Sequence, residues 1–173
     1  MKIGTQYWMR DNLEASSYVG GEALPRLDAV TANVVGYLQS ATEHYFYTAN
    51  VVLSNKILPA HWSIPDWKDW NILKDYLNGE ASLLKSGTWL PLKAGEQVQS
   101  ATNLSGFNGI PVGMYVGAFQ TDYEKKHLAY WTLDNANAAI DIKVFYLKSD
   151  TDIIEESNAG VDTKAFAIRC IRK

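Results

Sequence analysis

The sequence predicts an α+β fold with an antiparallel sheet, and two observations lead to this prediction. Helical periodicity occurs in the first part of the chain, whereas apolar residues alternate with their neighbours mainly after residue 105. Strand and helix patterns do not follow one another regularly, as they would in a doubly wound parallel sheet. The chain of 173 residues has the length of one domain, and its 47% hydrophobic content is enough for a core.

The first third of the chain is expected to hold one strand and two helices. Residues 3–9 are typical of a short strand, and residues 16–26 of a loop, because the latter are polar and interrupted by glycine and proline. Over residues 27–38 apolar side chains recur every three or four positions, which favours a helix although several are β-branched. Residues 49–53 are expected to form a second, short helix.

The clearest predicted helix begins after Asp66. An aspartate at this position can accept hydrogen bonds from the free amides of the first helical turn. Asp69 adds negative charge near the positive end of the helix dipole. The Asn-Gly pair at 78–79 can end the helix, because glycine adopts the left-handed conformation easily. Apolar residues at spacings of three and four predict a buried face that carries Trp70, Leu73 and Leu77.

Strands are expected in the second half of the chain, where the period of the pattern is two. They should cover residues 110–119, 127–133, 140–147 and 166–171. Three glycines spaced four apart lie between residues 109 and 117, and we interpret them as places where strand backbones approach closely. The longest uncharged stretch is too polar for a membrane-spanning helix, so no transmembrane segment is expected.

Composition argues against several classes of function. The net charge of −3 and the lack of a basic stripe argue against nucleic-acid binding. The single cysteine, Cys170, excludes an intrachain disulfide, and its apolar neighbours predict a buried, unreactive thiol. The three histidines show no metal-binding spacing, and nucleophile and phosphate-binding motifs are missing. We therefore expect no catalytic residues, no cofactor and no metal site.

The acidic residues 150–156 raise the question of a calcium site. They lack the spacing of an EF-hand loop, so a solvated turn is the better interpretation. At the other end of the chain, residues 1–6 lack the basic and apolar regions of a signal peptide. This leaves open a cytoplasmic protein or one from which a leader has been removed.

Several segments, spread over almost the whole chain, together resemble one family. Residues 3–13 read IGTQYWMRDNL, residues 62–70 read WSIPDWKDW, residues 107–113 read FNGIPVG, residues 129–132 read AYWT and residues 166–171 read FAIRCI. In this order they resemble the Fibrobacter succinogenes major paralogous domain family, which is spread through Bacteroidetes-type surface proteins. The first and the last segments are the most specific.

The resemblance implies a C-type-lectin-like fold, which is a twisted antiparallel sheet with two flanking helices, long loops and adjacent termini. It also implies export and attachment to the cell surface or outer membrane, in some members as part of fimbriae or adhesins. We expect one domain over residues 1–173, with residues 15–43 as an insertion relative to the family. Leu58 stands where the family often has a cysteine, so a disulfide at that position is absent.

Three functions remain open for such a chain. The expected one is a non-catalytic binding or adhesion module of the cell surface, whose ligand is a glycan or a protein. The first alternative is a structural subunit of a surface fibre. The second is an enzyme related to the formylglycine-generating enzymes, which work through cysteines and a metal. The resemblance favours the binding module, because the only cysteine lies on a segment that is typical of a core strand.

In relatives with this fold, ligands meet the protein in the segment before the final strands. The resemblance therefore places the candidate ligand surface at Tyr123, Trp131, Asp134, Asn135 and Asn137. An aromatic platform beside short polar groups is common in recognition sites. The alternative is that Trp131 faces the core and that the polar residues form only a turn. Calcium should not be required, because the calcium-binding triplets of lectins with this fold are poorly matched here.

Overall fold

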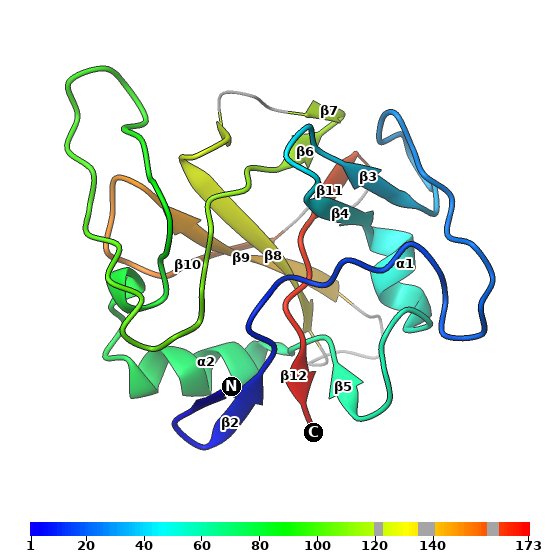
Figure 1. The fold of residues 1–173 in the computed structure, drawn as a ribbon, viewed down its shortest axis with the longest axis horizontal. Helices are drawn as coiled ribbons and strands as arrows, with labels where there is room; N and C mark the ends of the chain where they lie inside the picture. Colours follow the sequence, from blue (N-terminus) through cyan, green and yellow to red (C-terminus); the bar gives the residue numbers. More distant parts are fainter. Residues whose placement is uncertain (120–122, 135–140, 159–162) are drawn as a thin grey trace.

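The computed structural model describes residues 1–119, 123–134, 141–158 and 163–173, and Figure 1 shows its fold. Two α-helices, α1 (Ala49–Ser54) and α2 (Trp67–Tyr76), and a short 3-10 helix, η1 (Ala81–Leu83), accompany the strands. The strands are β1 (Lys2–Ile3), β2 (Gln6–Trp8), β3 (Tyr37–Gln39), β4 (Tyr45–Thr48), β5 (Trp62–Ser63), β6 (Tyr115–Val116), β7 (Ala118–Phe119), β8 (His127–Asp134), β9 (Asp141–Lys148), β10 (Glu155–Asn158), β11 (Lys164–Phe166) and β12 (Ile171–Arg172).

The described strands form three sheets, with the orders β1-β2-β12-β5, β10-β9-β8 and β3-β4-β11-β6-β7. Neighbouring strands pair in antiparallel fashion throughout these sheets. The prediction of an α+β fold with antiparallel sheets is thus confirmed. In Figure 1 both chain ends lie on the same side of the molecule, close to α2, because β12 pairs with β2.

Helix α2 forms as the sequence predicts. Asp66 is its N-cap, and the Asp66 carboxylate accepts a hydrogen bond from the amide of Asp69 at 3.0 Å. The Asp69 carboxylate accepts one from the Asp66 amide at 2.8 Å, which completes a reciprocal capping box. The apolar side of the helix faces the core and buries Trp70, Leu73 and Leu77.

Two clusters of buried apolar side chains make up the core. The first is centred on Trp70, whose ring stacks on Phe145 of β9 with ring centres 3.9 Å apart. The second contains Trp131 of β8 and Phe166 of β11, with ring centres 4.6 Å apart, and also Cys170. Strands β8 and β9 supply side chains to both clusters, so they connect the two halves of the core.

The predicted helix over residues 27–38 is wrong. The chain forms an irregular loop there and closes on itself before it enters β3. The amide of Leu27 donates to the carbonyl of Tyr37 at 2.8 Å, and the amide of Tyr37 donates to the carbonyl of Pro25 at 2.9 Å. A Cβ atom at Gly36 would lie only 2.5 Å from that same carbonyl. The apolar spacing therefore reflects burial in a closed loop, and the β-branched residues already weakened the helix.

Three predicted strands are shorter or divided in the structure. Residues 3–9 belong to a hairpin of β1 and β2, with Gly4 in the turn at a φ of 57°. Only the end of the segment 110–119 is strand, as β6 and β7, and the segment 166–171 is divided between β11 and β12. Residues 111–114 and 167–170 of these segments are buried without alternation, because both of their sides are covered.

The other predicted elements are close to what is observed. Residues 49–53 fall in α1, and residues 16–26 are irregular. Residues 127–133 coincide with β8 and residues 141–147 with β9, whereas residue 140 lies outside the described residues. The close approach expected at Gly109 is present, because a Cβ atom there would lie 2.7 Å from the carbonyl oxygen of Leu84. The acidic segment 150–156 contains a turn, but its end enters β10 and is not a turn alone.

Candidate functional site

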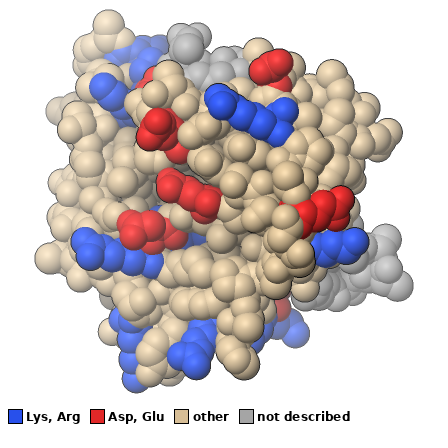
Figure 2. All heavy atoms as spheres, turned by 45° about the vertical axis from the view of Figure 1, so that its right-hand side comes forward, with Lys and Arg blue, Asp and Glu red and all other residues tan. Residues whose placement is uncertain are grey.

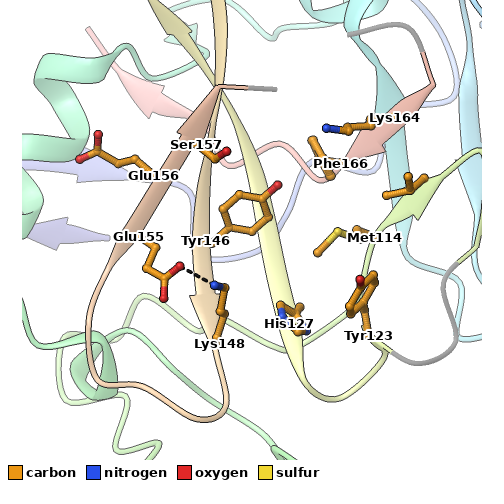
Figure 3. A pocket seen from close by; sticks show the side chains of 11 residues that line it. Met114, Tyr123, His127, Tyr146, Lys148, Glu155, Glu156, Ser157, Lys164 and Phe166 are labelled. Carbon is orange, nitrogen blue, oxygen red and sulfur yellow. Dashed lines mark hydrogen bonds and ion pairs between the residues drawn. The ribbon is translucent and has the colours of Figure 1, made fainter. Parts of the chain in front are cut away.

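A cleft of about 540 Å³ lies between two of the sheets (Figure 3). Strands β8, β9 and β10 form one wall, and β6 and β11 of the five-stranded sheet form the other. The two walls come from different sheets, so their separation leaves a hollow that a single continuous sheet would not have. Residues far apart in the sequence, between Met114 and Phe166, line it together.

The floor of the cleft is apolar and continuous with the second core cluster. Phe166 and Met114 are buried there, and the half-buried Tyr146 lies above them in the middle of the cleft (Figure 3). The rings of Tyr146 and Phe166 meet edge to face, with centres 6.2 Å apart. This contact packs the Tyr146 ring against the floor, so the cleft has an aromatic surface.

Charged side chains line the edges of the cleft. The ammonium of Lys148 on β9 lies 2.5 Å from a carboxylate oxygen of Glu155 on β10, so the two charges neutralise each other. Lys164 on β11 points toward the cleft from the opposite wall (Figure 3). Its ammonium has no ion-pair or hydrogen-bond partner in the described part of the chain. Glu156 also lines the cleft, and in Figure 3 its carboxylate is directed away from Tyr146.

His127 and Tyr123 close one end of the cleft. Their rings meet edge to face with centres 4.7 Å apart. His127 is buried, and its Nδ1 atom has no hydrogen-bond partner among the described residues. Burial, with a contribution from the positive charge of Lys148, lowers the pKa of His127 to about 4. The imidazole is therefore neutral at pH 7.

Tyr146 keeps its proton over the whole physiological range. Burial raises the pKa of Tyr146 to about 12, and the neighbouring Tyr123 and Glu155 act in the same direction. The Tyr146 hydroxyl is not hydrogen-bonded to any side chain or backbone group in the residues the structure describes. It is therefore a hydrogen-bond donor available to a molecule in the cleft.

The structure does not bring the predicted site residues together. Tyr123 is 36% exposed and lines the cleft, whereas Trp131 is fully buried and donates from Nε1 to the carbonyl of Tyr47 at 2.7 Å. Trp131 is a core residue, and we remove it from the candidate surface. Asp134 is the last residue of β8, at the far end from Tyr123, and Asn135 and Asn137 lie outside the described residues. An eight-residue strand separates its ends by roughly 25 Å.

Sequence reasoning missed most of the residues that line the cleft. The alternation in β9 contains a usable signal, because Tyr146 and Lys148 share a face with the buried Val144 but are only half-buried. That pattern indicates a sheet face that is partly open. By contrast, Lys164 and Phe166 reach the cleft only because their sheet packs opposite the sheet of β8, β9 and β10. No local sequence pattern specifies how two sheets pack.

Other chemistry is limited within the described residues. Cys170 is fully buried, and burial raises the pKa of its thiol to about 12. No three His, Cys, Asp or Glu side chains of the described segments are grouped as metal ligands.

Acidic and basic side chains are interspersed on the face drawn in Figure 2. None of the described helices has the length and apolar character that a membrane span needs. The predictions that no nucleic acid, cofactor or calcium is needed stay predictions.

Comparison with known proteins identifies the family. Residues 1–172 match the model of the Fibrobacter succinogenes major domain. No curated protein and no solved structure gives a significant match to the chain. The family match extends from the N-terminal hairpin to β12, so it includes every strand that lines the cleft. The resemblance seen in the sequence is thereby confirmed, and the chain belongs to the Fibrobacter succinogenes major domain family.

Proposed function

We propose that this domain is a non-catalytic binding module of an exported, surface-attached protein, and that the cleft holds its ligand. The observation that carries the proposal is the cleft itself, in which the Tyr146 ring packs on an apolar floor and polar groups lie around it. Its volume of about 540 Å³ is within the usual range for sites that bind small molecules or single residues of a polymer.

The chemistry of the cleft favours binding over catalysis. His127 is a poor general base at neutral pH, because its pKa is about 4 and no described group accepts a hydrogen bond from Nδ1 to orient the ring. Lys148 and Glu155 are paired with each other. Cys170, which a relationship to the formylglycine-generating enzymes would place at the reaction centre, lies in the core with a strongly protonated thiol.

We further propose that the fold is C-type-lectin-like. The neighbouring termini, the two short helices and the long irregular segments between β2 and β3 and between η1 and β6 support this assignment. Surface attachment is supported by family membership together with this fold. A binding domain whose ends lie side by side can be joined to an anchor on one side and present the opposite surface to a ligand.

A fibre subunit is the competing function, and one feature of β10 argues against it. β10 is an edge strand of its sheet, and edge strands are the usual sites of strand addition between protein chains. Its first two residues are Glu155 and Glu156, and charged residues on an edge strand oppose such pairing. We therefore expect a monomer at micromolar concentration.

Glycan and protein arrays probed with the purified domain test the proposed function. Binding to at least one array component should be lost in Tyr146→Ala, which removes the aromatic ring in the middle of the cleft. It should persist in Tyr76→Ala, because Tyr76 is an exposed tyrosine on α2 outside the cleft. Analytical ultracentrifugation of the same samples should show a monomer. Ligands that bind Tyr146→Ala as well as the native domain, or assembly into fibres, would contradict the proposal.

A further inference from the structure

Building on the function proposed above, we propose that the ligand of the cleft is an acidic saccharide, with its carboxylate paired to Lys164. The inference starts from the charges that face the cleft. Lys148 and Glu155 form a neutral pair, and His127 is uncharged at pH 7. Glu156 lines the cleft, but its carboxylate is directed away from Tyr146 in Figure 3. The Lys164 ammonium is the remaining charge directed into the cleft from the described residues, and it has no partner among them.

An unpaired ammonium at the edge of a partly buried cleft favours an anionic ligand. Hydrogen bonds between an ammonium and a carboxylate are shorter and stronger than those between neutral groups. The Lys164 side chain is half-buried beside Phe166 and Val116, so an ion pair there is screened less by water than one on an open surface. A carboxylate on the ligand would supply the counter-charge that the described residues do not.

The rest of the cleft fits the other parts of a sugar. A pyranose ring has apolar C–H groups on one face, and the ring of Tyr146, packed against Phe166, offers a matching surface. Sugar hydroxyls both donate and accept hydrogen bonds. The Tyr146 hydroxyl and the Lys148 ammonium can donate to them, and the Glu155 carboxylate can accept from them.

An acidic peptide would meet the same lysine but fits the cleft less well. An extended peptide gains most of its affinity by pairing its backbone with a free strand edge. The free edge beside the cleft is β10, which begins with Glu155 and Glu156. A peptide paired with β10 would run beside the carboxylate of Glu156, which repels acidic side chains. A saccharide instead places one carboxylate at Lys164 on the opposite wall. The charge arrangement therefore favours the saccharide.

Isothermal titration calorimetry with two matched pairs of probes tests the inference. The first pair is sialyllactose and lactose, and the second is oligogalacturonate and its methyl ester, which has the same chain without the charges. We expect at least one acidic probe to bind about tenfold or more tightly than its neutral partner, and more weakly as salt is added. The pair that shows the difference identifies the source of the carboxylate as a sialic or a uronic acid.

Variants of the domain assign the effect to Lys164. Lys164→Gln should weaken binding of the acidic probe about tenfold and leave binding of the neutral probe unchanged. Lys164→Arg should restore most of the affinity. Lys93→Gln makes the same charge change at an exposed site outside the cleft, and it should have no effect. Thermal melting of each variant verifies that it is folded.

The outcomes separate this inference from the proposed function. Equal affinity for acidic and neutral probes, lost in Tyr146→Ala but not in Lys164→Gln, would overturn the acidic saccharide and keep the cleft as a binding site. Binding of an acidic peptide, such as a short polyglutamate, without binding of either saccharide pair would also overturn the acidic saccharide. Failure of all these probes would overturn the acidic saccharide, while an array ligand lost in Tyr146→Ala would still support the binding function.

Discussion

The guanidinium of Arg169 holds the side-chain oxygen of Asn12 through two nitrogens, Nη2 at 2.7 Å and Nε at 3.1 Å. Arg169 is only 1% exposed. Its guanidinium group lies over the ring of Phe107, with the guanidinium carbon 4.5 Å from the ring centre. The remaining hydrogen bonds of the guanidinium go to the Tyr130 hydroxyl and to backbone carbonyls of Met9, Arg10, Phe107 and Asn108. One buried cation thus joins the first and the last segments that carry the family resemblance.

Arg169→Met should destabilise the domain strongly. The substitution keeps much of the side-chain volume but leaves several buried carbonyl groups without a donor, and we expect a loss of about 3–5 kcal/mol in the free energy of unfolding. Urea denaturation followed by tryptophan fluorescence measures this loss. Arg172→Met, at an exposed position of β12, is the control and should change stability by about 0.5 kcal/mol or less. Similar midpoints for both variants would show that the network around Arg169 contributes little.

Trp70→Ala should destabilise the domain by about 3–5 kcal/mol, because Trp70 is 1% exposed and contacts both Trp8 and Phe145. Truncation leaves a cavity at the centre of the first core cluster, which the surrounding rings can fill only in part. Ile72→Ala on the exposed side of the same helix is the matched control. Thermal melting checks both variants, and a melting temperature within a few degrees of the native value for Trp70→Ala would refute its core role.

His127 should make stability depend on pH in the mildly acidic range. Its pKa is about 4 in the folded protein and about 6.5 in the unfolded chain, so the unfolded chain binds more protons between these values. The free energy of unfolding should therefore fall as the pH is lowered from about 6.5 to about 4, by at most about 3 kcal/mol, and the contribution levels off below pH 4.

Comparison with His127→Gln isolates this effect, because the variant lacks the titrating group and keeps every other one. The difference in stability between the two proteins should change with pH only in the window given above. A difference that stays constant from pH 7 to pH 4 would mean that His127 titrates normally in the folded state.

Cys170 should react slowly with thiol reagents in the folded domain. It is fully buried and its pKa is about 12, so neither access nor thiolate is available at pH 8. Labelling by a chromogenic disulfide should proceed at the rate of unfolding and become rapid in denaturant. Reaction of the native protein as fast as a small free thiol would contradict this placement.

The sequence predicts an element well when the residues that determine it lie within or next to that element. The ends of α2 follow from Asp66, Asp69 and the glycine at 79, which act within a few residues of the helix. The helix expected over residues 27–38 failed because apolar spacing there reflects contacts with distant parts of the chain. A periodic pattern without caps is therefore weaker evidence than a shorter pattern with them.

The candidate site was less predictable than the fold. Tyr123 was expected at a ligand surface and does line the cleft, but Trp131 points to the core and not outward. The alternation in β8 assigns Trp131 to a face, yet that face is covered by Phe166 from another sheet. Which face of a strand such as β8 remains open is decided by the packing of the sheets, and this information is not contained in the strand itself.

Chemical-shift mapping by NMR tests the central claim, the assignment of the cleft as the ligand site, most directly. The domain labelled with nitrogen-15 would be titrated with the acidic probe of higher affinity or, if neither binds, with a ligand from the arrays. We predict that the largest changes occur at Tyr123, His127, Tyr146, Ser157 and Lys164, on both walls of the cleft. Changes concentrated instead around the hollow formed by Val19, Glu22 and Lys56 would contradict the assignment.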